Sequence, residues 1–188
     1  MPHYDFSTFP TLETERLRLR RITTDDRDAW LAVLADPNVT RYLSDVQEPF
    51  STSEMIDPLL NWADAIFNEK TGIRWAITRQ NNPTLIGTCG FHKLSQSNRH
   101  AEIGYELHSN YWRQGIMSEA LKALIRFCFD ELDLHRLYAD VTEGNQASAG
   151  ILLRLGFSQE GTWREAVWKE TQFRDLWLFG LLRHEYQS

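Results

Sequence analysis

The chain has 188 residues, 42% of them hydrophobic and 24% charged, which is typical of a soluble globular protein large enough for one domain with its own core. The formal net charge of −6 argues against a nucleic-acid-binding protein, which usually carries a basic surplus. No apolar run approaches the roughly 20 residues of a membrane-spanning helix, and no signal peptide is visible at the start. We therefore expect a cytoplasmic protein that binds neither nucleic acid nor membrane.

The N-terminal third alternates between one strand and helical segments. Residues 16–20 alternate apolar with charged side chains, as in a half-buried strand. Thr24 is the expected cap of the next helix, and Pro37 is expected to end it. Residues 51–69 predict one or two further helical pieces, with Asp57 as an N-cap before a proline at the first helical position.

The remaining chain predicts strands and helices without a repeat, a linker or a break in composition, which indicates a single domain over 1–188. Gly87 and Gly90, inside one of the strands, suggest a bulge or a close backbone approach. We expect a mixed sheet whose first half is mostly a meander, with helices on both faces. The strands are expected at 75–78, 85–92, 101–108, 136–143 and 176–182, with a turn at 81–83, an extended segment at 157–168, and helices at 119–132 and 146–155.

The loop at 112–118 stands between the strand at 101–108 and the helix at 119–132. The first turn of a helix has N–H groups without intrahelical partners and a partial positive charge, which suit phosphate oxygens. Gly115 lets the backbone approach a ligand closely, Arg113 adds a charge, and Ser118 adds a hydroxyl. We interpret this loop as a pyrophosphate cradle; the alternative is an ordinary helix start with a turn glycine and a solvated arginine. The cradle residues are Arg113, Gln114, Gly115, Ile116, Met117 and Ser118.

Cys89 and Cys128, the two cysteines of the chain, both lie in apolar runs. Neither has the spacing to another cysteine or a histidine that is typical of zinc sites. Buried free thiols and no bound metal are therefore expected, with a catalytic cysteine as the minor alternative.

A second motif follows the cradle. It reads Asn145-Gln146-Ala147-Ser148, then Leu153-Arg154-Leu155-Gly156-Phe157 and Glu160-Gly161. Together with the cradle, it resembles the GNAT superfamily of acetyl-CoA-dependent N-acetyltransferases, and more narrowly the RimJ/RimL branch that acetylates protein N-termini. Further matching pieces at 14–20, 102–105, 112–121, 174–175 and 181–186 extend the resemblance over nearly the whole chain, in the family's order. It implies the α/β (α+β) GNAT fold, in which the central sheet splays between two middle strands and admits the pantetheine arm.

The resemblance also implies roles for individual residues. Backbone N–H groups of the 101–108 strand, at Leu107 and His108, are expected to bind acetyl-CoA where the strands splay. Asn145 offers an amide to the pantetheine or the leaving group; as a residue just before a helix it is equally an N-cap. Ser148 stands where RimL-type enzymes have a serine that assists the leaving thiolate.

Three positions depart from the family pattern. Leu152 stands where many GNAT enzymes have a tyrosine that acts as the acid to the leaving thiolate, and Met117 stands where most have glycine or alanine. Val167 occupies the position of the RimL-type glutamate that helps to deprotonate the amine. Glu165 lies two residues earlier, and in an extended strand it would point to the same face, so it is our candidate base; the alternatives are a solvated strand residue and no protein base at all.

The expected function is direct acetyl transfer from acetyl-CoA to a primary amine, most simply the α-amine of a protein or peptide N-terminus of the ribosomal-protein type. The loops at 40–52 and 165–174 show no pattern that names the acceptor. A polyamine, an amino sugar and a drug amine are therefore alternatives, and so are a non-catalytic acyl-CoA-binding module and a generic phosphate binder. A homodimer is expected from the family, helped by aromatic residues in the C-terminal part: Trp163, Trp168, Phe173, Trp177 and Phe179.

Overall fold

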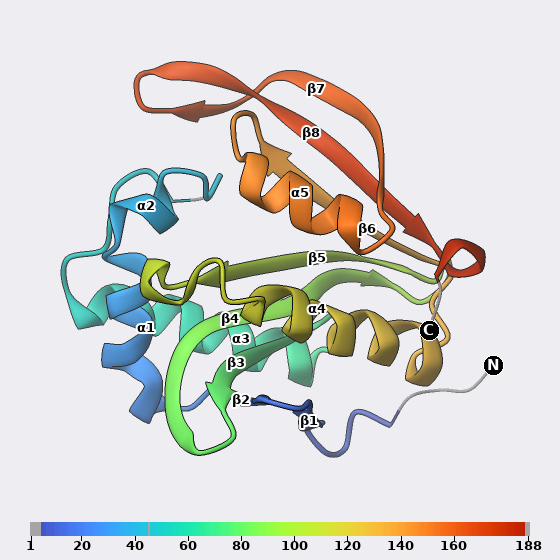
Figure 1. The fold of residues 1–188 in the computed structure, drawn as a ribbon. Helices are drawn as coiled ribbons and strands as arrows, with labels where there is room; N and C mark the ends of the chain where they lie inside the picture. Colours follow the sequence, from blue (N-terminus) through green and yellow to red (C-terminus); the bar gives the residue numbers. More distant parts are fainter. Residues whose placement is uncertain (1–4, 45, 187–188) are drawn as a thin grey trace.

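A single eight-stranded sheet organises the protein in the computed structural model, which describes residues 5–44 and 46–186 (Figure 1). The strand order is β1-β2-β3-β4-β5-β6-β8-β7, so the first five strands form the expected meander. Every neighbouring pair is antiparallel except β5 and β6, which run parallel. The strands are β1 (Leu12–Glu13), β2 (Leu17–Arg21), β3 (Ile73–Arg79), β4 (Asn82–Ser95), β5 (His100–Leu107), β6 (Arg136–Thr142), β7 (Ser158–Lys169) and β8 (Gln172–Leu182).

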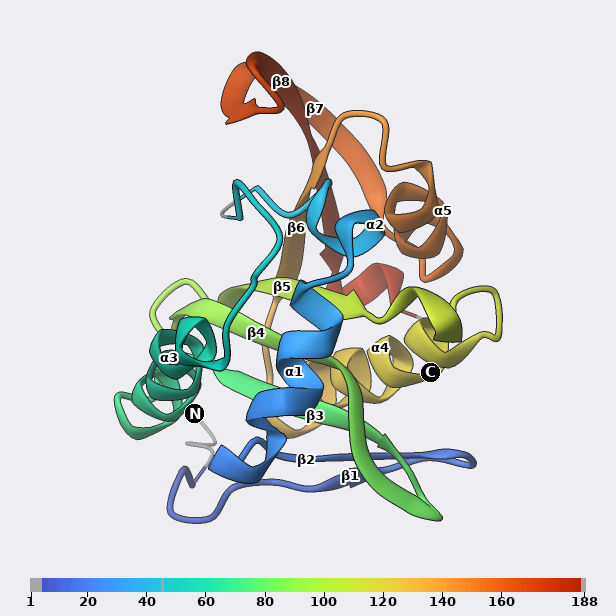
Figure 2. The same cartoon turned by 90° about the vertical axis from the view of Figure 1, so that its left-hand side faces the viewer.

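Helices cover both faces of the sheet, as expected, and each face has its own apolar core. One core joins α1 and α3 to the sheet around Trp30 and Ile56, and the other joins α4 and α5 to it around Leu121 and Leu152. Figure 2 shows α3 and α4 on opposite sides of the strands. The helices are α1 (Arg27–Leu34), α2 (Pro37–Thr40), α3 (Asp57–Asn68), α4 (Ile116–Arg126, continued by a π-helical turn at Phe127–Glu131) and α5 (Gln146–Arg154).

The parallel pair β5–β6 is joined over only three residue pairs, from His100 opposite Arg136 to Glu102 opposite Tyr138. Beyond that point each strand remains paired on its other side, β5 with β4 and β6 with β8. The two strands therefore diverge and leave a notch between their inner edges, which is the splay that the family resemblance implies. Figure 1 shows β6, β8 and β7 leaning away from β5 beyond this point.

Several predicted boundaries are corrected. Pro37 does not merely follow α1; it begins the short helix α2, with the Asp36 side chain as its cap. Asp57 lies inside the first turn of α3, because a 3-10 turn at Ser53–Ile56 precedes it. The turn between β3 and β4 falls at 80–81, so Pro83 lies within the strand.

The strand glycines Gly87 and Gly90 mark close backbone approaches. A Cβ at Gly90 would collide with the carbonyl of Ile73 on β3, and one at Gly87 with the carbonyl of Glu106 on β5. Gly90 lies in a regular part of the ladder, so the close approach alone explains it, whereas Gly87 also borders the register shift between β3 and β4. Over the described ranges, no helix has the length and apolarity to cross a bilayer.

Candidate active site

The loop before α4 presents unpaired backbone N–H groups. Gly115 has φ 75° and Arg113 has φ 59°, both in the left-handed region, and this conformation turns the chain into the helix. The N–H of Glu119 bonds to the carbonyl of Gly115 at 3.0 Å and closes the first turn. The N–H groups of residues 115–118 have no hydrogen-bond partner in the described part of the chain. This is the geometry that binds an anion at a helix start.

Arg16, just before β2, and Arg79, at the end of β3, hold this loop in place. Arg16 pairs with Glu119 at 2.6 Å and donates to the carbonyl of Gln114 at 3.1 Å. The Gln114 side chain accepts from Arg79 at 3.2 Å and donates to the carbonyl of Asn110 at 2.9 Å. The side chain of Gln114 thus stabilises the loop, and only the backbone N–H of this residue is left to contact a ligand.

The other cradle residues differ in what they expose. Ile116 and Met117 are buried in the core, so only their backbone N–H groups face outward. Arg113 is exposed and Ser118 is half-buried. Arg113 and Ser118 are therefore the cradle side chains that remain available to a ligand.

The inner edge of β5 offers a second row of N–H groups. The N–H of His108 donates to the carbonyl of Ile86 at 3.0 Å, so the expectation that it is free for a ligand is wrong. In an antiparallel ladder the residues that bond to one neighbour alternate with those that face the other way. The register of β4 and β5 therefore directs the N–H groups of Ile103, Tyr105 and Leu107 towards β6. The N–H of Ile103 belongs to the short ladder with β6, and those of Tyr105 and Leu107 face the notch, which keeps Leu107 as a candidate.

The start of α5 faces the same notch. The Asn145 side chain accepts from the N–H of Ser148 at 3.1 Å, which confirms its N-cap role and leaves its amide nitrogen for other contacts. The Ser148 hydroxyl lies 2.6 Å from the Tyr105 hydroxyl of β5. Burial raises the pKa of Tyr105 to about 12, so this phenol keeps its proton at neutral pH. Tyr105 was not among the predicted site residues, although the alternation of β5 places its side chain on the face of the sheet that α5 covers.

Glu165 does not sit in a regular strand. Its φ is 53°, and its N–H donates to the Asp175 carboxylate at 2.8 Å. The register passes from Trp163 opposite Leu176 to Val167 opposite Arg174, so β7 carries two extra residues here. The alternation that was expected to place Glu165 and Val167 on one face is therefore broken, and Glu165 lies exposed, outside the cavity described next.

A cavity of about 500 Å³ lies on the α1/α3 side of the sheet and continues through the notch to Ser148. Its walls come from α1, α3, residues 42–44 and 46, strands β3 to β6, and Leu176 of β8. The cradle lies at the start of α4, on the opposite face of the sheet. A thioester in the notch would therefore be accessible to the cosubstrate side from one face and to the acceptor cavity from the other. Polar and aromatic residues that line the cavity include Trp30, Trp62, Arg74, Glu102 and Asp140.

A buried polar network forms the floor of this cavity. Arg74 and Glu106 form an ion pair, and their side chains are only 9% and 6% exposed. Arg74 Nε donates to Thr88 Oγ1 at 2.7 Å, and Trp30 Nε1 donates to Glu106 Oε1 at 3.0 Å. Thr88 also donates to Glu106, so every member of the network is tied to a neighbour. None of these residues had been singled out from the sequence.

The rim of the cavity carries acidic groups. Glu102 accepts from Lys93 at 2.8 Å and lies 3.2 Å from His92 Nε2. Burial opposes ionisation of Glu102, but the hydrogen bonds from His92 and Lys93 outweigh it, so the pKa stays below its ordinary value and the carboxylate is charged at neutral pH. Asp140 on β6 adds a second, exposed carboxylate.

Residues 42–44 and 46 are held over the cavity by two side chains. Lys169 of β7, 3% exposed, donates to the carbonyls of Leu43, at 3.1 Å, and Val46. Thr142 of β6 donates to the carbonyl of Tyr42 at 3.0 Å. The β7–β8 hairpin thus helps to shape the cavity, which Leu176 of β8 also lines.

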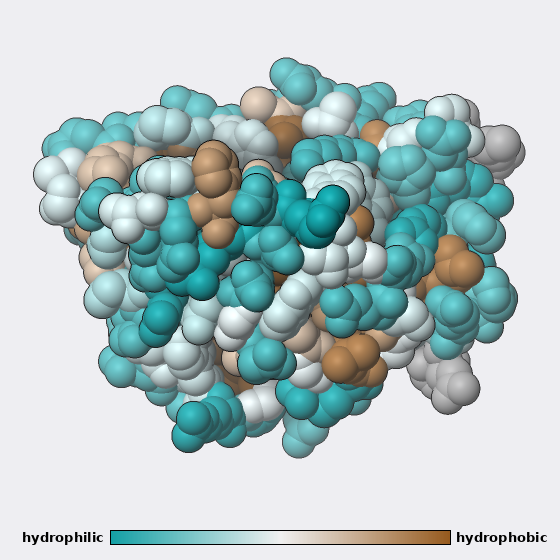
Figure 3. Space-filling model, turned by 90° about the horizontal axis from the view of Figure 1, so that it is seen from above, coloured by the Kyte–Doolittle hydropathy of each residue, from teal (hydrophilic) through white to brown (hydrophobic). Residues whose placement is uncertain are grey.

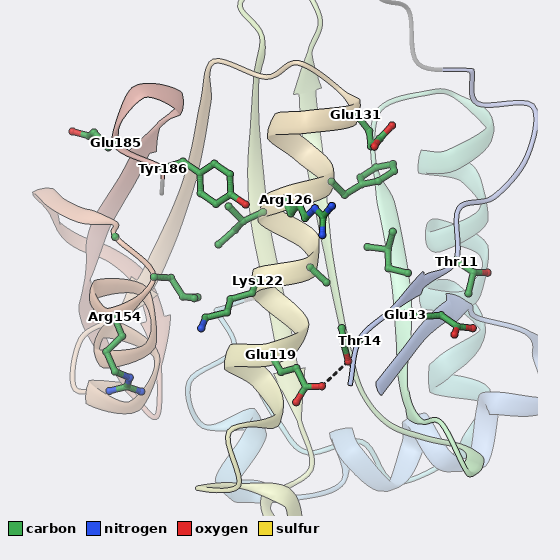
Figure 4. A pocket seen from close by; sticks show the side chains of 16 residues that line it. Thr11, Glu13, Thr14, Glu119, Lys122, Arg126, Glu131, Arg154, Glu185 and Tyr186 are labelled. Atoms are coloured by element: carbon green, nitrogen blue, oxygen red, sulfur yellow. Dashed lines mark hydrogen bonds between the residues drawn. The ribbon is translucent and has the colours of Figure 1, made fainter. Parts of the chain in front are cut away.

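A larger groove, of about 1020 Å³, runs along the outer face of α4 (Figure 4). Its lining includes basic side chains, such as Lys122 and Arg126, and acidic ones, such as Glu119. Thr14 donates a hydrogen bond of 2.6 Å to Glu119 at its edge. None of the sequence-predicted site residues lines it. Its size therefore does not identify it as the reaction site.

The cysteines are buried and free, as expected. Burial raises the pKa of Cys89 to about 12 and that of Cys128 well above its ordinary value, so neither is a thiolate nucleophile at neutral pH. Within 5–44 and 46–186, no three histidine, cysteine or acidic residues gather in a metal-binding arrangement.

Comparison with known proteins agrees with this architecture. Residues 16–158 match the family model of the acetyltransferase (GNAT) domain. The N-acetyltransferase YoaA of Bacillus subtilis (strain 168) is 42% identical over 161 residues, 86% of this chain and 90% of that protein. The [ribosomal protein uS5]-alanine N-acetyltransferase of Escherichia coli (strain K12) is 28% identical, covering 87% and 86%. RimL, a ribosomal L7/L12 α-N-protein acetyltransferase solved with coenzyme A, has the same fold, with a TM-score of 0.83, 23% identity and coverage of 92% and 98%. The chain therefore belongs to the GNAT family of acetyltransferases.

Proposed function

We propose that this N-acetyltransferase acts on the α-amine of a protein or peptide N-terminus, of the ribosomal-protein type. The observation that carries the proposal is the notch between β5 and β6. Unpaired N–H groups of the cradle lie on one side of it, and a cavity with an acidic rim lies on the other. Such an arrangement suits an anionic cosubstrate and a cationic acceptor that meet in the middle.

Acetyl-CoA fits the α4 side of the notch. The N–H groups of 115–118 and the exposed Arg113 would hold its pyrophosphate. The N–H groups of Tyr105 and Leu107 would bind the pantetheine arm and polarise the thioester carbonyl. The cradle and the strand edge together fix the acetyl group in the notch.

The transfer itself needs a neutral amine and a stabilised leaving group. The amine nitrogen attacks the thioester carbon, the C–N bond forms, the C–S bond breaks, and the nitrogen loses a proton. The thiolate of CoA leaves; since model thiols have a pKa of about 8.5, it gains from a hydroxyl donor at neutral pH. Ser148 would supply that donor, and Tyr105 would hold it in place by the 2.6 Å hydrogen bond.

The acceptor class follows from proton chemistry. An α-amine has a pKa near 8, so roughly a tenth of it is neutral at pH 7, whereas a lysine side chain is neutral only to about four parts in ten thousand. Val167 in place of the family glutamate leaves the enzyme with little help for a lysine. Similarity to RimL and to the uS5-alanine enzyme supports the α-amine.

Glu165 remains our candidate for the proton acceptor, acting through water because it does not line the cavity. Glu165→Gln should lower kcat/KM at pH 7 and lose most of its effect above pH 9, where the amine is neutral without help. An effect that is absent, or equal at both pH values, would leave bulk water as the proton acceptor.

A turnover screen tests the function. Four acceptor classes should be compared at the same acetyl-CoA concentration. They are peptides with a free N-terminus, N-terminally blocked versions of these peptides that contain an internal lysine, polyamines, and aminoglycosides. We expect the free N-terminus to be acetylated fastest. A strong lysine or polyamine preference would contradict the proposal, and tight CoA binding without turnover on any amine would favour the non-catalytic binding module instead.

A homodimer through the β7–β8 hairpin completes the proposal. Trp163, Trp168 and Phe173 are 60%, 51% and 57% exposed, and the rings of Trp168 and Phe173 pack edge to face at 4.9 Å. Phe179, by contrast, is buried in the core. Figure 3, which looks down on the hairpin side, shows hydrophobic residues as separate patches on a mainly hydrophilic face. Sedimentation equilibrium should give about twice 22.0 kDa; a 22.0 kDa species alone at micromolar concentration would refute the dimer.

A further inference from the structure

We propose that Arg74 recognises the carbonyl oxygen next to the acceptor amine, so that the cavity selects an α-amino acyl group over a simple amine. This inference rests on the proposed function and assigns part of its specificity to one side chain. It would make Arg74 a specificity-determining residue that touches the acceptor and takes no part in proton transfer.

The guanidinium of Arg74 is held rigidly. Nε donates to Thr88 at 2.7 Å, Nη2 pairs with Glu106, and the ring of Trp62 lies 5.9 Å from the guanidinium carbon. A group fixed on three sides loses little entropy when it binds a ligand, so its remaining donors are already positioned for one.

The third nitrogen, Nη1, is the one left over. Among the described residues it has no hydrogen-bond partner, yet it is not one of the buried polar atoms without a partner, so it is open to the cavity that Arg74 lines. It lies 3.2 Å from the position that a Cβ would take at Gly104, on the strand that borders the notch. Gly104 therefore leaves the space through which Nη1 faces the notch.

The neighbouring charges decide which oxygen fits. Glu106 already balances the charge of Arg74, so Nη1 favours a neutral carbonyl over a carboxylate. Glu102 and Asp140 at the rim attract an ammonium group and repel a carboxylate. A peptide N-terminus presents an amine and a carbonyl oxygen on adjacent carbons and no carboxylate nearby, whereas a free amino acid has the carboxylate and a polyamine has no oxygen at all.

A matched substrate pair isolates this contact. A short alanyl peptide is compared with its E-alkene isostere, in which the first carbonyl is replaced and the shape is kept. Rates are normalised to the neutral fraction of each amine, from its own measured pKa. Losing a hydrogen bond to a charged donor should lower kcat/KM about tenfold or more in the native enzyme.

The variant Arg74→Lys keeps the charge beside Glu106 and removes Nη1. It should slow the peptide far more than the isostere, so that the ratio of the two rates falls close to one, whatever its effect on the rate that both substrates share. Arg21→Lys, an exposed arginine on the neighbouring strand β2, is the matched control and should keep the native ratio. If Arg74→Lys folds poorly, the pair Arg74→Met with Glu106→Gln removes the donor without leaving a buried charge.

The outcomes separate this inference from the proposed function. A native enzyme that acetylates peptides with no preference over the isostere, or a preference that survives in both Arg74 variants, overturns the role of Arg74 and leaves the function standing. A native enzyme that acetylates neither substrate, or that prefers spermidine or free alanine to the peptide, overturns the assigned acceptor class and the inference with it.

Discussion

The two sides of the notch are built in different ways. On the cosubstrate side, the groups that would meet the ligand are backbone N–H groups from one loop, 113–118, and one strand edge. On the acceptor side, they are side chains that three strands and one helix bring together: Arg74, Glu106, Glu102, Trp62 and Asp140. A backbone site depends on local conformation, whereas a side-chain site depends on the whole fold. The first tolerates changes of neighbouring side chains, and the second does not.

The largest expected effect is on the stability of the acceptor side. Arg74→Met leaves Glu106 charged and unpaired in the core, which should lower the free energy of unfolding by about 3–5 kcal/mol in urea denaturation at pH 7. Adding Glu106→Gln should recover most of that loss. Arg21→Met, which breaks an exposed ion pair with Asp64, is the control and should cost at most about 1 kcal/mol. A small loss for Arg74→Met alone would mean that the floor network is not a buried charge pair.

The next effect concerns the point where the two sides meet. Ser148→Ala should lower kcat about 100-fold, the lower end for a positioned proton donor, with little change in the KM for acetyl-CoA. Because the pKa of Tyr105 is about 12, the deficit should stay constant from pH 7 to pH 10. Tyr105→Phe should reproduce part of it. A native kcat in Ser148→Ala would mean that Ser148 is only a structural residue of the first turn of α5 and takes no part in the reaction.

The smallest effect is expected on the backbone side, because several N–H groups share the ligand. Arg113→Ala should weaken CoA binding by about 1.5 kcal/mol, slightly more than tenfold, in calorimetry. Gly115→Val should weaken it as well, since a β-branched residue resists φ 75° and its side chain occupies the approach to the N–H groups. Gly156→Val, at φ 91° and outside the cradle, is the matched control for strain. Native CoA affinity in a folded Gly115→Val protein would show that the cradle is misplaced.

The sequence predicted the fold well, because the fold follows from local patterns. Alternation, caps and glycines located most strands and helices to within a few residues, β1 and α2 excepted, and the splay came from the family resemblance. The cradle was readable because Gly115 and its neighbours are contiguous. Which N–H groups of β5 are free depends on its register with β4, and that is why the prediction for His108 was wrong.

The residues of the acceptor side could not be predicted from the sequence, because they meet only through the register of several strands. Arg74 and Glu106 are 32 positions apart and meet only because β3, β4 and β5 pair in one register. Glu165 failed differently: the alternation rule assumes a regular strand, and two extra residues in β7 break it. Tyr105 was within reach, since the period of β5 alone places it beside α5.

The short pairing of β5 and β6 has a consequence for the free protein. Two strand edges face each other across the notch without bonding, so the sheet carries an open edge in its centre as well as at its margins. Such an edge accepts any extended chain of hydrogen-bonding groups, and the pantetheine arm is one, so cosubstrate would fill the place of a missing strand. Amide hydrogens at 105 and 107 should then exchange quickly in the free protein and slowly with CoA bound. Ligand binding and completion of the sheet would be one event, and the protein would gain stability from its own substrate.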